Sequence, residues 1–143
     1  MSQAKEITAT YLRTKETMKK YITAFEERKQ PGKSHNPFQY TINNPEGSII
    51  QEFNHWFIMK NDFPYDAVAD IHHMIVTKRE VPFNWNLLTE EEIDEFQTLR
   101  ENYLADNYDV IYENLPSGQT QPGWFHINLL KLKRTSLEEF MNN

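Results

Sequence analysis

His126 stands out as a side chain that could act as a nucleophile. It lies in an apolar stretch of strand-forming residues, from Trp124 to Lys133, directly after a polar loop. Alternate residues of a strand share a face, so His126 and Asn128 are predicted to lie side by side on one surface. Because imidazole can attack phosphorus near neutral pH, this placement favours chemistry at a phosphate. The loop offers backbone N–H groups, hydroxyls and a carboxamide to phosphate oxygens through Ser117, Gly118, Gln119 and Thr120.

A structural role for these residues is the alternative. A single histidine on a strand is more often a hydrogen-bonded structural residue than a catalyst, and a polar loop containing glycine is usually only a turn. His72 and His73 do not make a metal site, because neighbouring residues of a strand face opposite sides. The sequence has no cysteine, no His-Glu-x-x-His motif and no Walker-type loop, so we predict neither a metal nor a cofactor.

Four strands and a crossing helix are predicted to position His126. The crossing helix begins at Thr89 with a capping box, and its buried stripe continues to Tyr103. Apolar residues at three- and four-residue steps predict another helix over 6–29, and a short one is expected from Thr135. β-Branched and aromatic residues predict strands over 49–59, 71–77, 108–113 and 124–133.

These elements predict an α+β domain, in which helices pack on one face of an antiparallel sheet. The first two strands are expected to form a hairpin with a long connection at residues 61–66. The sequence Pro31-Gly32 ends the first helix and predicts a boundary between an N-terminal amphipathic helix over 1–32 and a main domain over 33–143. In the connector that follows, residues 38–42 alternate like a short strand.

Composition restricts the possible partners. The 143 residues are 38% hydrophobic and 25% charged, which is typical of one folded domain. Fifteen Lys and Arg against 21 Asp and Glu give a net charge of −6, which disfavours binding to a long nucleic acid. No run approaches the roughly 20 apolar residues that span a membrane, so no membrane interaction is predicted. Cysteine and a secretory signal are both absent, so we expect a cytoplasmic protein.

Residues 49–132 resemble the histidine triad (HIT-like) superfamily of nucleotide hydrolases and transferases. The stretch Trp124-Phe-His-Ile-Asn-Leu-Leu130 is similar to the family signature His-φ-His-φ-His-φ-φ, in which φ is an apolar residue. Asn114 and the polar loop precede this stretch in the family's order. Asn61 and His72 match positions in the first half of the family pattern. The joint agreement in order and spacing is more specific than any single motif.

The resemblance implies a HIT-like fold and a role for each matching residue. The middle histidine is the nucleophile in the family, so His126 would attack the α-phosphorus of a nucleotide and Asn128 would donate to the leaving oxygen. Asn61 would contact the ribose, and His72 would support the site. The other substrate contacts implied are Asn114, Ser117, Gly118, Gln119, Thr120 and Trp124. The resemblance also implies a homodimer whose ligand is a nucleotide or a nucleotide-containing small molecule.

Two functions remain open. Trp124 stands where the family has its first histidine, and Asn128 stands for the third. A nucleotidyl hydrolase or transferase is favoured because His126, Asn114 and the polar loop are retained. A nucleotide-binding or interaction module without turnover is favoured by Trp124, because an indole offers one donor and no acceptor. A role of the N-terminal helix as a dimer or partner surface is compatible with either function.

Overall fold

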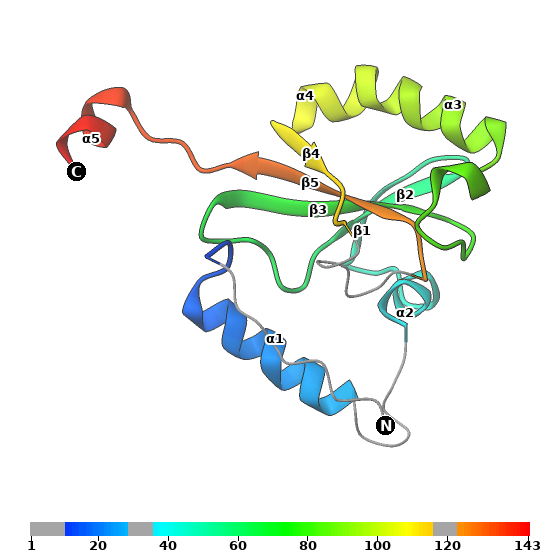
Figure 1. Ribbon diagram of the computed structural model, residues 1–143, viewed down its shortest axis with the longest axis horizontal. Coiled ribbons are helices and arrows are strands. Elements are labelled where there is room, and N and C mark those ends of the chain that lie inside the picture. Colours follow the sequence, from blue (N-terminus) through cyan, green and yellow to red (C-terminus); the bar gives the residue numbers. More distant parts are fainter. Residues whose placement is uncertain (1–10, 29–35, 116–122) are drawn as a thin grey trace.

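Five antiparallel strands form a single sheet in the order β1-β2-β3-β5-β4 (Figure 1). The structure is a computed structural model, and it describes residues 11–28, 36–115 and 123–143. The strands are β1 Ile49–Glu52, β2 Trp56–Lys60, β3 Ala69–Thr77, β4 Val110–Tyr112 and β5 His126–Leu132. The helices are α1 Lys15–Arg28, α2 Pro37–Asn43, α3 Glu90–Leu99, α4 Ala105–Asn107 and α5 Leu137–Asn142. A 3-10 turn, η1, covers Trp85–Leu87, and a π turn, η2, covers Arg100–Leu104 and joins α3 to α4.

Asn128 lies on the strand that is second from one edge of this sheet. Its strand, β5, pairs with β3 on one side and with β4 on the other. Asn128 is opposite Met74 in the first ladder and opposite Tyr112 in the second. Strands β2 and β3 pair across the long connection at 61–68, as expected. The antiparallel sheet with its helices confirms the predicted α+β class.

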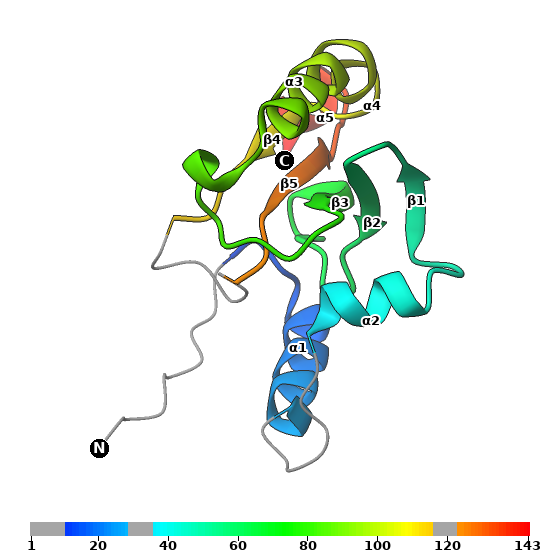
Figure 2. The ribbon, with the colours of Figure 1, turned by 90° about the vertical axis from the view of Figure 1, so that its right-hand side faces the viewer.

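Helices cover both faces of the sheet (Figure 2). Helix α3 lies over one face, and α1 and α2 lie on the opposite side, so the expectation that helices pack on one face only is wrong. The core under α3 includes Trp56, Ile58, Ile75, Phe125, Ile127 and Leu129. The core under α2 comprises Phe38, Phe57, Met59, Val76 and Trp124. Adjacent residues Trp124 and Phe125 thus enter different cores, which is the predicted alternation of a strand.

The crossing helix α3 begins as predicted. The Thr89 hydroxyl accepts a hydrogen bond from the Glu92 N–H, and the Glu92 carboxylate accepts one from the Thr89 N–H at 2.8 Å. Glu92 is buried and also pairs with the Arg79 guanidinium at 2.8 Å. The indole of Trp56 on β2 donates to the Glu92 carbonyl at 2.9 Å, which fixes the helix to the sheet. The capping box therefore combines a local start signal with a tertiary anchor.

Helix α2 replaces the short strand predicted over residues 38–42. Asn36 is its N-cap, and the Asn36 carboxamide oxygen accepts from the N–H groups of Phe38 and Gln39. Pro37 fits the first helical position, where no N–H is needed. Phe38 and Thr41 face the core three residues apart, as on one side of a helix. Alternation over five residues did not distinguish this helical turn from a strand.

Two further element boundaries differ from the predictions. Helix α1 begins at Lys15. The described residues 11–14 are therefore not helical, although the predicted helix over 6–29 includes them. The single strand predicted over 49–59 is two strands, β1 and β2, which pair antiparallel around a turn at residues 53–55. The sequence Asn54-His55 supplies this turn within an otherwise β-prone stretch.

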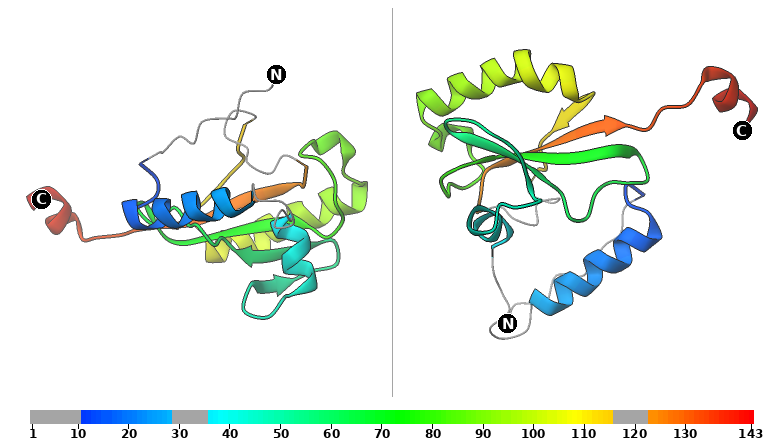
Figure 3. Two further views of the ribbon diagram at one scale, coloured as in Figure 1. Left: turned by 90° about the horizontal axis from the view of Figure 1, so that it is seen from below. Right: turned by 180° about the vertical axis from the view of Figure 1, so that it is seen from behind.

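Helix α5 projects from the end of β5, away from the sheet (Figure 3). Ser136 caps it by accepting from the Glu139 N–H at 3.1 Å, and the helix lies where a short one was expected from Thr135. Helices α1 and α2 lie on the opposite side of the sheet from α3 in the right-hand view of Figure 3. In the described part of the chain, no helix is both long enough and apolar enough to cross a membrane.

Candidate active site

His126 begins β5 with its ring held in one tautomer. Ring nitrogen Nδ1 lies 2.8 Å from the Trp124 carbonyl oxygen. A carbonyl oxygen can only accept a hydrogen bond, so Nδ1 carries the proton of the neutral ring and Nε2 carries the lone pair. Burial lowers the pKa of His126, and this effect outweighs the opposing hydrogen bond to Trp124. A neutral ring with a free lone pair on Nε2 is the nucleophilic form of histidine.

His72 orients Asn128 on the same face of the sheet. The Tyr65 N–H donates to Nδ1 of His72 at 3.0 Å, so Nε2 of the neutral ring carries the proton. Nε2 lies 2.8 Å from the Asn128 Oδ1 atom and donates to it. Burial, partly opposed by this hydrogen bond, lowers the pKa of His72 to about 4. The pair therefore stays neutral, and the Asn128 amide nitrogen is directed away from His72.

The Asn128 amide nitrogen is a donor without an acceptor. Asn128 is 3% exposed, and its Nδ2 atom has no hydrogen-bond partner among residues 11–28, 36–115 and 123–143. The Tyr112 hydroxyl is also buried and unpartnered in those ranges. Tyr112 is opposite Asn128 in the β4–β5 ladder, so both side chains share a face. Buried donors are normally satisfied, so these two are available to an acceptor other than the described residues.

Asn61 lies at the start of the connection between β2 and β3. Its Oδ1 atom accepts from the Phe63 N–H at 2.8 Å, which closes a local turn. Its Nδ2 atom lies 3.4 Å from His72 Nε2, and both nitrogens are donors, so this contact is not a hydrogen bond. The structure thus brings Asn61 next to His72, with the amide oxygen already used by the turn.

Trp124 fills the core next to His126. It is 2% exposed, and its indole N–H donates to the Thr77 carbonyl at 2.8 Å. Phe38 of α2 packs against both residues, with ring-centre distances of 5.9 Å to Trp124 and 4.8 Å to His126. The single donor of the indole is therefore committed to the backbone. In this structure Trp124 holds the end of β5 and α2 together, and the substrate contact that the resemblance implied stays a prediction.

The remaining predicted phosphate contacts lie after β4. Asn114 is half-buried and follows Tyr112 by two residues, while His126 precedes Asn128 by two residues. Because Tyr112 is opposite Asn128, an extension of the antiparallel register would set Asn114 opposite His126. The other predicted contacts, Ser117, Gly118, Gln119 and Thr120, lie outside the described residues. Their role stays a prediction.

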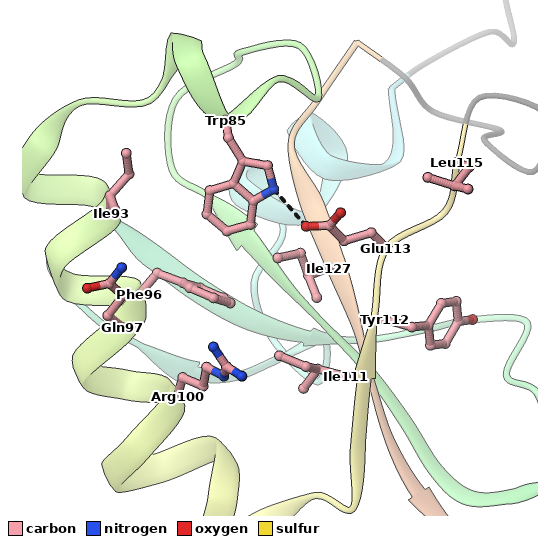
Figure 4. Close-up of a pocket in the computed structure, with 10 residues that line it drawn as sticks. All are labelled: Trp85, Ile93, Phe96, Gln97, Arg100, Ile111, Tyr112, Glu113, Leu115 and Ile127. Carbon is pink, nitrogen blue, oxygen red and sulfur yellow. Dashed lines mark hydrogen bonds between the residues drawn. The ribbon is translucent and has the colours of Figure 1, made fainter.

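A separate pocket lies on the opposite face of β5, between α3 and β4 (Figure 4). Its volume is about 580 Å³, and Ile127, whose side chain alternates with those of His126 and Asn128, lines it. The Trp85 indole donates to the Glu113 carboxylate at 2.6 Å at its rim. None of the predicted site residues that the structure describes lines this pocket. In the same described ranges, no three His, Asp or Glu side chains are grouped to hold a metal ion.

A family model described as "Protein of unknown function (DUF3605)" matches residues 2–138. The chain belongs to this family. No curated protein gives a significant match to this DUF3605 chain. A solved structure named "Hit Like Protein" is similar, with a TM-score of 0.52 and 17% identity over 68% of this chain and 98% of that chain. A HIT family hydrolase from Clostridium thermocellum has a TM-score of 0.49 and 16% identity over 69% of this chain and 91% of that chain.

The likeness to the Hit Like Protein bears on the fold of the DUF3605 chain. At 17% identity it shows that the two chains share the HIT-like arrangement of sheet and crossing helix, as the sequence resemblance predicted. The evidence for the candidate site of this chain comes from the contacts of its own residues. Two contributors escaped prediction from the sequence, namely Tyr65 and Tyr112. Only Tyr65 had a local signal, since it lies in the turn that precedes His72.

Proposed function

We propose that this protein binds a nucleotide or a nucleotide-containing small molecule and cleaves it at the α-phosphate through His126. The observation that carries the proposal is the pair of fixed side chains on one face of β5. His126 has its lone pair on Nε2, and Asn128, two residues later, has an unpartnered amide donor. A nucleophile beside a donor that lacks an acceptor fits attack on a phosphoryl group, whose oxygens gain charge in the transition state.

In the first step, Nε2 of His126 attacks the α-phosphorus. A bond forms between nitrogen and phosphorus, and the bond from phosphorus to the leaving group breaks with its electron pair. The Nδ1 proton of His126 stays on the ring, hydrogen-bonded to the Trp124 carbonyl, and stabilises the positive charge that the ring gains. The Asn128 amide donates to the leaving oxygen or to a phosphoryl oxygen, which lowers the barrier.

In the second step, water or another hydroxyl acceptor attacks the same phosphorus. A new bond from oxygen to phosphorus forms, the bond from nitrogen to phosphorus breaks, and the electron pair returns to Nε2. The acceptor releases one proton to the solvent, and the products are a nucleoside monophosphate or its ester together with neutral His126, which keeps its Nδ1 proton. The low pKa that burial gives His126 favours the return of the neutral ring.

A nucleotide-binding module without turnover is the second candidate. Two observations favour it: Trp124 is buried at the first triad position, and Phe38 packs 4.8 Å from the His126 ring centre. An enzyme needs Nε2 to reach phosphorus, so the cover that α2 provides argues for binding alone. The two candidates predict the same ligands and differ in product release.

Product analysis by mass spectrometry separates the two candidates. The protein is incubated with dinucleoside polyphosphates, nucleoside phosphoramidates and nucleotide sugars, and thermal shift is measured with the same compounds. We expect release of a nucleoside monophosphate, reduced by on the order of 10³-fold or more in His126→Ala. The matched control is His55→Ala, because His55 lies in the β1–β2 turn and β3 separates β2 from β5 in the sheet.

Each outcome decides between the proposals. Release that is lost in His126→Ala and kept in His55→Ala supports the histidine nucleophile. Saturable stabilisation by a nucleotide without any release supports the binding module. Release that persists in His126→Ala contradicts the nucleophile, and the absence of both signals contradicts both functions.

A further inference from the structure

Arg13 is a cation that is held in place but not neutralised. It precedes α1, and its Nε donates to the Phe63 carbonyl at 2.7 Å. The guanidinium lies over two aromatic rings, 4.8 Å from the centre of Tyr21 and 4.8 Å from the centre of Tyr65. In the described part of the chain, no carboxylate forms an ion pair with it. Its two terminal nitrogens also have no hydrogen-bond partner there.

The segment on either side of Arg13 is fixed to the connection between β2 and β3. The Ala67 N–H donates to the Leu12 carbonyl at 3.0 Å. On the other side, Asp66 accepts from the Thr14 N–H at 2.9 Å and from the Thr14 hydroxyl at 3.0 Å. Arg13 therefore lies between two anchored neighbours, and the placement of its side chain is set by the fold.

Arg13 reaches the predicted site through Tyr65. The other contacts of the Tyr65 ring are with His72, at a ring-centre distance of 4.5 Å, and with Tyr112, stacked at 5.9 Å. The charge of Arg13 is close enough to contribute to lowering the pKa of His72, after burial, and to oppose the rise in the pKa of Tyr112 that burial causes. Arg13, Tyr112 and the His72–Asn128 pair thus form one contiguous group.

The free groups of this cluster can each donate a hydrogen bond. They are the terminal N–H groups of Arg13, the amide N–H groups of Asn128 and the hydroxyl of Tyr112. A planar guanidinium matches the paired oxygens of a phosphate or carboxylate, and it is a better match than an ammonium group. An oxyanion can accept from each of these donors, whereas a neutral apolar ligand leaves them unpaired.

We infer that Arg13, with Asn128 and Tyr112, binds a phosphoryl group of the ligand, so that the N-terminal segment completes the site. The identification of the ligand as a nucleotide rests on the proposed function. The binding of a phosphoryl group rests on the contacts of these three residues. The N-terminal segment is thus part of the binding machinery and does more than cover the sheet. The segment contributes the positive charge of Arg13 to recognition, whereas the cluster residues on the sheet are neutral.

Binding to the full chain is measured by calorimetry with inorganic phosphate, pyrophosphate, AMP and adenosine. We expect pyrophosphate and AMP to bind, adenosine to bind at least tenfold more weakly than AMP, and Arg13→Ala to weaken both anions at least tenfold. Arg13→Lys keeps the charge but loses the planar fork, so it should be intermediate. Lys20→Ala is the matched control, because Lys20 is an exposed cation of α1 and its loss changes the net charge equally.

The inference is overturned if Arg13→Ala binds the anions as the unchanged protein does, if Lys20→Ala weakens binding as much, or if no phosphate compound binds at all. If Arg13→Ala does not fold, as judged by circular dichroism, the comparison of Arg13→Lys with Lys20→Ala decides. Anion binding that depends on Arg13, without release of a nucleoside monophosphate, supports this inference while contradicting the proposed catalysis.

Discussion

The hydrogen bond between His72 and Asn128 depends on His72 being neutral. Tyr65 donates to one ring nitrogen, so the other must carry the proton that it donates to Asn128. Protonation of His72 places a proton on Nδ1 as well, where it faces the Tyr65 N–H, and puts a charge on a residue that is only 4% exposed. The orientation of the Asn128 amide is therefore linked to pH.

Stability is expected to fall as pH falls from 6.5 to about 4. The pKa of His72 is about 4 in the folded chain because of burial, against an ordinary value of 6.5. As pH decreases, the unfolded chain binds this proton first, so the contribution is complete above pH 6.5 and is lost over this window. The loss amounts to about 3 kcal/mol. Urea unfolding at pH 7, 5.5 and 4 measures it.

The control for this pH dependence is His72→Gln, which has no titrating ring. The free energy of unfolding of this variant should be lower at pH 7, and it should change less between pH 7 and pH 4. An equal pH dependence in both proteins would show that other groups cause it. His126 and His73 are two such groups, because burial lowers their pKa values as well.

At the scale of elements, the sequence predicts those parts whose signal is local. The capping box of α3 needs only Thr89 and Glu92, and the alternation of β5 needs only its own residues. Both were predictable and both are confirmed. Helix α2 was not predicted, because five alternating residues fit both the period of a strand and that of a helix. The helix-start signal, Asn36 followed by Pro37, lies just before these five residues.

The loss of the Asn36 cap should destabilise the fold at α2. Asn36→Ala removes the acceptor for the N–H groups of Phe38 and Gln39, and we expect a decrease of about 1 kcal/mol in the free energy of unfolding. Chemical denaturation measures this decrease. Asn86→Ala is the control, because Asn86 is exposed and its loss should change stability by less than about 0.5 kcal/mol. Equal losses in the two variants would show that α2 needs no cap.

The tertiary contacts of the candidate site were beyond prediction from the sequence. The alternation of β5 placed His126 and Asn128 on one face, but the tautomer of His126 depends on a carbonyl in the folded chain. Likewise, Arg13 lies 52 residues before Tyr65, and only the folded chain brings them together. Local periodicity carries no information on such contacts.

At the scale of the whole molecule, Asp66 joins the N-terminal segment to the sheet. Burial raises the pKa of Asp66, but hydrogen bonds from Thr14 and Thr17 outweigh burial and hold the pKa below its usual value of 3.8. For a carboxyl with a lowered pKa, the stabilisation is present above the usual value and is lost as pH falls through the lowered one. Docking of the segment should thus persist at neutral pH. The division into residues 1–32 and 33–143 and the homodimer stay predictions.

Asp66→Asn should release the N-terminal segment. We expect backbone amides of residues 12–18 to exchange about tenfold faster with deuterium, because charge-assisted hydrogen bonds to Thr14 and Thr17 are weakened. The control is Asp62→Asn, since Asp62 is exposed in the same connection. Unchanged exchange in Asp66→Asn, or an equal increase in Asp62→Asn, would show that Asp66 does not hold the segment.

The most direct test of the central claim is to look for the covalent intermediate on His126. The protein is mixed with a nucleoside phosphoramidate, quenched in alkali, where a phosphorus–nitrogen bond to histidine is preserved, and analysed by intact and peptide mass spectrometry. Our account predicts one nucleoside monophosphoryl group on the peptide that contains His126, and none in His126→Ala. Release of product without an adduct at His126, or an adduct at another residue, would contradict it.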